Sequence, residues 1–291
     1  MAHPYVLNVI SREAVFLAEK LRSLPGCAPD IQWLSPDYAL DLSFTGDPGT
    51  LRKGAHDAAD GIAADINVVA TAHRRKKLLV ADMDSTIIAC ECLDEVAAMA
   101  GFGAHVAAIT ERAMRGEIAF EPALRERVAL LKGLPVNMLE RVYAERVRLN
   151  PGARALTATM RAHGAHTLLV SGGFTFFTRR VAQAAGFDAE QANVLIDDGH
   201  VLTGEVVEPI LGRAAKLEAL EEAMAMLKIK PADALAVGDG ANDLDMINRA
   251  ALGVAYHAKP IVAAAAPARI MHGDLRGLLY LQGYRDEEIV E

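Results

Sequence analysis

The stretch LLVADMDST at residues 78–86 decides the fold of this 291-residue chain. Residues 78–81 form a continuous apolar run, which is typical of a parallel strand covered on both faces. Similar runs occupy residues 167–170, 234–237 and 252–255, and segments with helical patterns separate the four. This alternation predicts an α/β fold in which right-handed crossovers build a parallel sheet.

Polar residues follow three of these apolar runs. They are residues 82–86 (DMDST), 171–173 (SGG) and 238–243 (GDGAND). The carboxyl ends of parallel strands meet at one edge of a sheet, and ligands bind there in open α/β folds. We therefore expect the three polar segments to form a single functional site.

Four aspartates lie at these strand ends, namely Asp82, Asp84, Asp239 and Asp243. In one cleft the four carboxylates would repel one another, unless they share a hard cation or one of them takes a proton. A few oxygen ligands with open positions suit Mg²⁺, which keeps waters and also binds phosphate oxygens. The sequence therefore predicts a magnesium site.

Groups that bind anions are expected at the same edge. The turn at Gly172 and Gly173 lets backbone N–H groups approach an anion closely, and the hydroxyl of Ser171 adds a donor. Lys216 lies in the helical segment before the third strand and adds a positive charge. An acidic metal site opposite anion donors is what phosphoryl transfer requires.

Taken in order, the Asp-x-Asp-x-Thr segment, the strand-end Ser, the Lys and the Gly-Asp-Gly-x-Asn-Asp segment resemble the haloacid dehalogenase superfamily. The segments DMDSTIIACECLDEVA, FEPALRERVALLKGLP, LLVSGGFTFFT and AVGDGANDLDMI resemble its phosphoserine phosphatases over roughly residues 75–285. The resemblance implies a Rossmann-like core with a helical cap insertion. It also implies Mg²⁺-dependent hydrolysis of O-phospho-L-serine to L-serine and phosphate through an aspartyl-phosphate, the last step of serine biosynthesis.

The resemblance also implies a role for each matching residue. Asp82 would be the nucleophile, and Asp84 the general acid and then the general base. Asp82, Asp239 and the backbone carbonyl of Asp84 would hold Mg²⁺, with Asp243 supporting these ligands from behind. The substrate would be bound by the remaining matches: Ser171, Gly172 and Lys216 at the phosphoryl group, Asn242 near the reacting groups, Glu91 at the ammonium, Arg127 at the carboxylate, and Met114 and Phe120 around the pocket.

Alternative interpretations stay open at this point. A phosphotransferase could pass the phosphate from phosphoserine to another small alcohol, such as homoserine. In a different class, the chain could be an amino-acid-sensing protein that works through its N-terminal domain. By spacing alone, Met114 and Phe120 would be helix-packing residues, and a single Glu or Arg on a helix is usually a solvated charge.

The chain length predicts two domains. Residues 1–72 follow a βαββαβ order, with strands near 5–10, 31–34, 38–44 and 67–70, and resemble a ferredoxin-like, ACT-like α+β domain. We interpret the basic run at residues 73–77 as a solvated connector and residues 73–291 as the phosphatase domain. Within the phosphatase domain, we assign the core to 76–90 and 152–291, the cap to about 91–151, cap helices to 93–116, 120–132 and 136–147, and a hairpin to 193–207.

The composition of the chain indicates which classes of binding partner to expect. The formal net charge of −8 disfavours a general nucleic-acid or anionic-membrane surface. The sequence has no apolar run near the ~20 residues of a membrane span, and its three cysteines are too few for a disulfide framework. We therefore expect a soluble cytoplasmic protein with a small-molecule substrate, and because ACT-like domains often pair edge to edge, a homodimer stays open.

Overall fold

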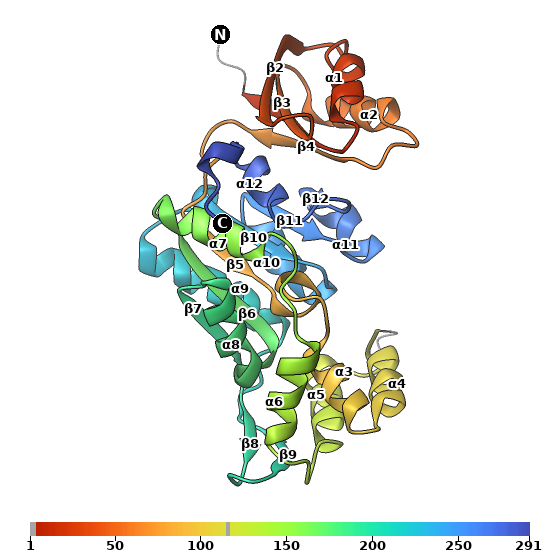
Figure 1. The fold of residues 1–291 in the computed structure, drawn as a ribbon, viewed down its shortest axis with the longest axis vertical. Coiled ribbons are helices and arrows are strands. Elements are labelled where there is room, and N and C mark those ends of the chain that lie inside the picture. The colour runs from red at the N-terminus through yellow and green to blue at the C-terminus, as the bar shows by residue number, and fades with distance from the viewer. Residues whose placement is uncertain (1–3, 115–116) are drawn as a thin grey trace.

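The computed structural model describes residues 4–114 and 117–291. Three parts follow one another along the long axis of the molecule (Figure 1): a small sheet with two helices, a larger unit with a central sheet, and a group of helices beside a hairpin. Within the described ranges, no helix has both the length and the apolar character that crossing a membrane requires.

The central sheet confirms the predicted α/β fold. All its neighbouring strands are parallel, in the order β12-β11-β10-β5-β6-β7. From β5 the chain proceeds to β6 and β7 on one side and then returns to β10 on the other, so the strand order reverses beside β5. Ligands bind at such a reversal. The strands are β5 (Leu78–Ala81), β6 (His166–Phe174), β7 (Ala189–Asn193), β10 (Ala234–Gly238), β11 (Leu252–Tyr256) and β12 (Ala268–Ile270).

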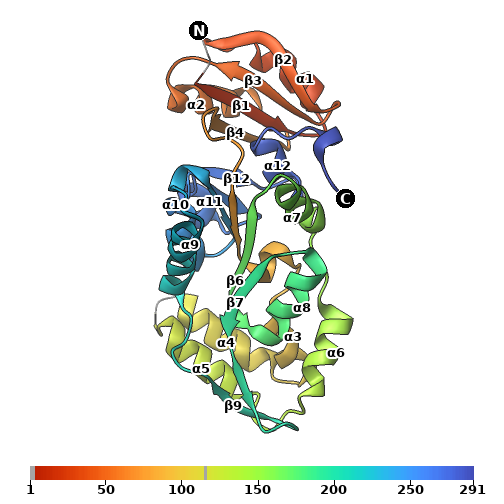
Figure 2. The same ribbon diagram turned by 90° about the vertical axis from the view of Figure 1, so that its left-hand side faces the viewer.

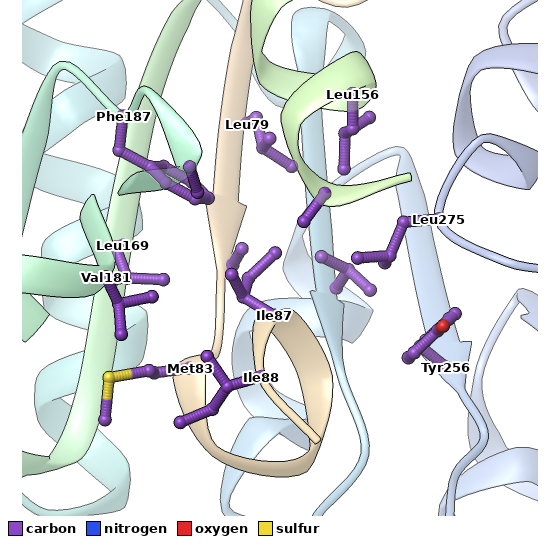
Figure 3. Close-up of a cluster of buried hydrophobic side chains, with 14 of the residues drawn as sticks. Leu79, Met83, Ile87, Ile88, Leu156, Leu169, Val181, Phe187, Tyr256 and Leu275 are labelled. Atoms are coloured by element: carbon purple, nitrogen blue, oxygen red, sulfur yellow. The ribbon is translucent and has the colours of Figure 1, made fainter. Parts of the chain in front are cut away.

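Helices cover both faces of this sheet. Leu79 packs in the cluster of α7, α8 and α12, whereas Leu78 packs with α9 and α10, as the alternation of side chains along a strand requires. Figure 3 shows Met83, Ile87 and Ile88 among the buried side chains beside β5. These three apolar residues anchor the polar turn that follows the strand. The helices are α7 (Ala153–Ala162), α8 (Thr175–Ala185), α9 (Arg213–Leu227), α10 (Leu244–Arg249), α11 (Pro260–Ala265) and α12 (Gly277–Leu281).

The N-terminal unit has the predicted βαββαβ order, and its antiparallel strands are arranged β2-β3-β1-β4. Leu7 and Val9 face α1 and α2, while Val6 and Ile10 join the hydrophobic core of the larger unit. Figure 2 shows α12 between this sheet and the central sheet. The elements are β1 (Tyr5–Ile10), α1 (Ala14–Leu21), β2 (Cys27–Ser35), β3 (Ala39–Phe44), α2 (Pro48–Ala58) and β4 (Asp65–Ala70).

The basic run at residues 73–77 is only in part the solvated connector that we predicted: His73, Arg75 and Lys77 are exposed, but Arg74 and Lys76 are not. The guanidinium of Arg74 bonds both carboxylate oxygens of Asp41, which is 2% exposed, and also donates to backbone carbonyls near the end of α12. Lys76 is 7% exposed and donates from Nζ to the carbonyl oxygens of His73 and Ala232. Arg74 therefore joins the N-terminal unit to the rest of the fold, and Lys76 fixes the connecting segment to the chain before β10.

In its described residues, the segment predicted to form a cap contains four helices, and it contacts a hairpin. A single helix over 93–116 was a wrong prediction, because Gly101 adopts a φ of 84° and separates α3 from α4. The predicted hairpin forms, and its β9 strand bonds the chain between α5 and α6 through Gly133 N to Leu202 O (2.8 Å). The elements are α3 (Cys92–Met99), α4 (Gly103–Met114), α5 (Phe120–Ala129), α6 (Asn137–Arg146), β8 (Leu195–Asp197) and β9 (Leu202–Val206).

Candidate active site

The turn after β5 carries the first two aspartates. Asp82 is 6% exposed, and its Oδ1 accepts a hydrogen bond from the N–H of Met83 at 2.8 Å. Ser85 then takes a left-handed φ of 56°, and the N–H of Ile88 closes the turn on the carbonyl of Met83 at 3.0 Å. This turn places Asp84 at the same strand end as Asp82.

Three of the predicted carboxylates form a cluster at this edge. One oxygen each from Asp82, Asp239 and Asp243 lie within 4.8 Å of one another. Thr86 donates its hydroxyl to Oδ1 of Asp239 at 3.1 Å, and the N–H of Gly240 donates to Oδ2 of Asp243 at 3.0 Å. The structure therefore brings residues from the ends of β5 and β10 together, as the sequence predicted.

Lys216 on α9 is the buried cation of this cluster. Its Nζ lies 2.7 Å from Oδ1 of Asp82 and 2.6 Å from Oδ1 of Asp243. Burial alone would lower the pKa of Lys216, but the two carboxylates outweigh burial and raise it, so the ammonium stays charged. One lysine does not balance three carboxylates, and burial together with Asp243 raises the pKa of Asp239 to about 6. The donor set therefore fits a further, divalent cation with a preference for oxygen ligands.

Asp84 has a different environment from Asp82. Its Oδ1 accepts the N–H of Cys92 at 2.9 Å in the first turn of α3, and its Oδ2 accepts the hydroxyl of Ser171 at 3.2 Å. Burial and the nearby Glu91 raise the pKa of Asp84 to about 6, although these hydrogen bonds act in the opposite direction. A carboxyl group with this pKa can both give and take a proton near neutral pH.

The predicted anion-binding loop lies at the end of β6. The strand bulges between Val170 and Phe174, and within the bulge the N–H of Gly173 donates to Oγ of Ser171 at 2.8 Å. A Cβ at Gly173 would lie 2.9 Å from Oδ2 of Asp84, so a side chain there would displace the carboxylate. Glycine is therefore required for the loop to approach Asp84 this closely.

The cap contributes further predicted residues to the site. Phe120, at the start of α5, lies against Gly172, where a Cβ would be 3.0 Å from its ring. Arg127, also on α5, is half-buried and has Asp94, Glu91 and Asp84 as its acidic neighbours. Because burial outweighs these carboxylates, the pKa of Arg127 is lowered from its usual value.

The other predicted residues have different positions. Glu91 is exposed at the start of α3, where its Oε1 accepts the hydroxyl of Ser85 at 2.7 Å. Asn242 lies on the turn with Asp243, and its side-chain oxygen lies beside Gly240. Met114 ends α4, and its side chain lies outside the described part of the structure.

Sequence reasoning missed Asn193, the last residue of β7. Its Nδ2 donates to the carbonyl of Gly172 at 2.9 Å, and its Oδ1 accepts the N–H of Leu211 at 2.7 Å. The signal was present in the sequence, because Asn193 is also a polar residue at the end of a parallel strand. It was missed because β7 has no continuous apolar run to identify it as a strand.

Together these groups suit nucleophilic chemistry on a phosphoryl group. Asp82 is a buried carboxylate beside a lysine, Asp84 has a pKa of about 6, and the segment 171–173 carries backbone N–H groups and a hydroxyl next to Asp84. All three lie at the carboxyl edge of the central sheet, where the strand order reverses.

Comparisons with known proteins agree with this geometry. The haloacid dehalogenase-like hydrolase family matches residues 79–248. The phosphoserine phosphatase of Polaromonas sp. is 50% identical over 210 residues, which cover 70% of this chain and 89% of that protein. The unliganded probable phosphoserine phosphatase from Vibrio cholerae is 30% identical with a TM-score of 0.78, covering 97% of this chain and 88% of its own.

A third relative is a phospho-aspartyl intermediate analogue of phosphoserine phosphatase. Its structure is 40% identical to this chain with a TM-score of 0.65, covering 70% of this chain and 98% of its own. The family match spans β5, β6 and β10. The carboxylates follow β5 and β10, the segment 171–173 lies in β6, and the strand order reverses beside β5. The chain therefore belongs to the haloacid dehalogenase-like hydrolases and is a phosphatase related to the phosphoserine phosphatases.

Proposed function

We propose that this protein hydrolyses O-phospho-L-serine to L-serine and inorganic phosphate, as the last step of serine biosynthesis. The observation that carries the proposal is the pairing of two aspartates with different environments: Asp82 is bonded to Lys216, and Asp84 is bonded to Ser171. The similarity to named phosphoserine phosphatases supports the choice of substrate.

The reaction proceeds in two displacements. A carboxylate oxygen of Asp82 attacks phosphorus, the bond from phosphorus to the serine oxygen breaks, and Asp84 gives its proton to the departing alkoxide. Asp84 then takes a proton from water, which attacks the aspartyl-phosphate and releases phosphate and the free carboxylate of Asp82. The raised pKa of Asp84 suits both of its steps, and the phospho-aspartyl analogue of a relative supports the intermediate.

The carboxylate cluster supports a Mg²⁺ requirement. Asp82, Asp239 and the backbone carbonyl of Asp84 would hold the ion, and Asp243 would support the cluster through its bonds to Lys216 and the N–H of Gly240. Bound there, Mg²⁺ would reduce the repulsion between Asp82 and the anionic substrate and stabilise charge on the phosphoryl oxygens.

The cap would recognise the amino-acid part of the substrate. We assign Arg127 to the substrate carboxylate, because a guanidinium fork matches two carboxylate oxygens and because Arg127 forms no salt bridge within residues 4–114 and 117–291, its Nε donating to the carbonyl of Ala123. Glu91 would bind the ammonium group. Phe120 lies against Gly172 and would cover the phosphoryl group and restrict access of water when substrate is bound.

We divide the chain accordingly into an ACT-like domain at 1–72 and a phosphatase domain at 73–291. The phosphatase domain has its core at 76–90 and 152–291 and its cap at about 91–151. The small four-stranded sheet, the central six-stranded sheet and the four cap helices support these boundaries.

A phosphate-release screen tests the proposal. With Mg²⁺ present, we expect phosphoserine to give the highest kcat/KM among phosphoserine, phosphothreonine and sugar phosphates. Released serine and released phosphate should be equal, with or without added homoserine. A preference for sugar phosphates would contradict the assignment of Arg127 and Glu91, and serine release that exceeds phosphate release would indicate phosphotransfer.

A further inference from the structure

A chain of hydrogen bonds joins the end of β7 to Asp84. Asn193, which is 2% exposed, donates from Nδ2 to the carbonyl oxygen of Gly172 at 2.9 Å. The N–H of Gly173 donates to Oγ of Ser171 at 2.8 Å, and that hydroxyl donates to Oδ2 of Asp84 at 3.2 Å. The peptide between the two glycines is the middle of this chain.

The geometry of that peptide couples its two ends. It is a trans peptide, so its C=O and N–H point in opposite directions. Holding the carbonyl on Asn193 therefore directs the N–H of Gly173 toward Ser171. Because the Ser171 hydroxyl accepts that N–H, its own hydrogen is left to donate to Asp84.

The local backbone explains why such a restraint is needed. Val170 pairs with Gln191 and Phe174 pairs with Asn193, so residues 171–173 bulge out of the ladder between β6 and β7. Glycines on both sides of the peptide allow it to rotate at little steric cost. A flipped peptide would direct its carbonyl oxygen toward the oxygens of Ser171 and Asp84, where it repels an anion instead of supporting its binding.

The same side chain reaches the segment before α9. Oδ1 of Asn193 accepts the N–H of Leu211 at 2.7 Å, and Nδ2 lies 3.2 Å from the carbonyl oxygen of the same residue. Two residues later begins α9, which carries Lys216. Asn193 therefore links the phosphate-binding loop to the element that places the buried lysine.

We propose that Asn193 is a positioning residue: it locks the Gly172–Gly173 peptide so that the Ser171 hydroxyl is directed onto Asp84. The proposal rests on the proposed function, in which Asp84 transfers the proton, and on the role at the phosphoryl group that the family resemblance implies for Ser171. Asn193 itself touches no reacting atom and acts through the peptide.

The test compares Asn193→Leu with a matched control, Asn67→Leu. Asn67 is also 2% exposed, and it lies where the N-terminal unit meets β12. Its side chain forms two hydrogen bonds with the backbone of Arg269, at 2.9 and 2.8 Å. We expect Asn193→Leu to lower kcat for phosphoserine about tenfold to a hundredfold, the effect of misdirecting one hydrogen bond to a charged group. Asn67→Leu should lower the melting temperature but leave kcat within about twofold of wild type, because the sites are independent.

A double-mutant cycle with Ser171→Ala separates positioning from general destabilisation. If Asn193 acts through Ser171, the double variant has a kcat within about twofold of Ser171→Ala alone. A second variant, Asn193→Asp, is assayed at pH 8. It keeps an acceptor for the N–H of Leu211 but offers the carbonyl of Gly172 no donor, so we expect the same loss of kcat as in Asn193→Leu. Three results would each overturn the proposal. The first is a double variant in which the kcat losses of Asn193→Leu and Ser171→Ala multiply. The others are full activity of Asn193→Asp and a kcat loss in Asn67→Leu equal to that in Asn193→Leu.

Calorimetric titration with inorganic phosphate and Mg²⁺ keeps this test independent of the substrate. If wild type released no phosphate from phosphoserine, the proposed function would fail, while the phosphate affinities would still decide the role of Asn193. A similar loss of phosphate affinity in Asn193→Leu and Ser171→Ala, without further loss in the double variant, supports it. Wild-type affinity in Asn193→Leu overturns it.

Discussion

The ammonium nitrogen of Lys216 lies 2.7 Å from Oδ1 of Asp82, and both side chains are buried. The same nitrogen lies 2.6 Å from Asp243, so one cation is shared by two carboxylates from different strand ends. A charge in such a position costs several kcal/mol to desolvate and is stabilised only by its partners. The contact therefore links the stability of the fold to the ionisation of Asp82, the proposed nucleophile.

Replacing this lysine should damage both activity and stability. In Lys216→Met, Asp82 and Asp243 lose their shared cation, and we expect kcat/KM to fall at least about a hundredfold, the scale of losing one group that stabilises transition-state charge. The metal-free variant should also lose about 3–5 kcal/mol in the free energy of unfolding. Lys230→Met, at an exposed position, is the control. Wild-type kcat/KM in Lys216→Met would contradict the role given to this contact.

The contact between Arg74 and Asp41 should stabilise the docking of the N-terminal unit. In Arg74→Met, the carboxylate of Asp41 is left buried without its partner, and we expect a loss of about 3–5 kcal/mol in chemical denaturation. The neighbouring Arg75 pairs with Glu288 in a more exposed position, so Arg75→Met should cost only about 0–1 kcal/mol. Equal losses in the two variants would show that burial of Asp41 does not decide the effect.

Binding of Mg²⁺ should weaken steeply at acid pH. The pKa of Asp239 is about 6, raised by burial and Asp243, and the ion binds the ionised carboxylate. We expect affinity measured by calorimetry to fall as the pH drops below about 6 and to level off above about 7.

Protonation of Asp239, which should weaken Mg²⁺ binding, should instead stabilise the metal-free fold. The folded pKa of this carboxyl group lies above the usual value of 3.8, so the folded state holds the proton more tightly than the unfolded state. Its contribution to stability is therefore present at low pH and is lost as the pH rises from about 4 to 6. Asp239→Asn should remove this contribution, and an unchanged pH profile of unfolding in that variant would contradict the assignment.

Substrate selection should depend on the cap. Arg127→Ala should raise KM for phosphoserine about tenfold or more, because the substrate carboxylate loses a bidentate partner. Hydrolysis of p-nitrophenyl phosphate, which has neither carboxylate nor ammonium, should change by less than about threefold. Arg125→Ala, on the same helix and paired with Glu208 in an exposed position, is the control. Equal losses with both substrates in Arg127→Ala would place this residue outside amino-acid recognition.

The sequence predicted which residues meet at the carboxyl edge of the central sheet, because the geometry of parallel strands constrains where their ends lie. Asp82 and Asp239 follow β5 and β10, and Ser171 lies near the end of β6; parallel strands leave little freedom in where their ends meet. The edge strands β7 and β12 were not predicted, since each pairs on one side only and needs no continuous apolar run. Asn193 was missed for the same reason.

Other differences arose from tertiary contacts that local patterns do not encode. Within a basic run, Arg74 has the pattern of a solvated charge. It is largely buried because it bonds Asp41 on β3, 33 residues away in the chain, and backbone carbonyls near the end of α12. The predicted helix over 93–116 divides at Gly101, where a left-handed turn lets α3 and α4 pack against each other.

The most direct test of the mechanism is to detect phosphate on Asp82. Phosphoserine labelled with radioactive phosphorus would be mixed with enzyme and Mg²⁺, quenched in acid within one turnover, and digested for mass spectrometry. The mechanism predicts one acid-stable, base-labile phosphoryl group on the peptide that contains Asp82, and no label and no turnover in Asp82→Asn. Phosphatase activity at the wild-type rate in Asp82→Asn, or label on any other residue, would contradict it.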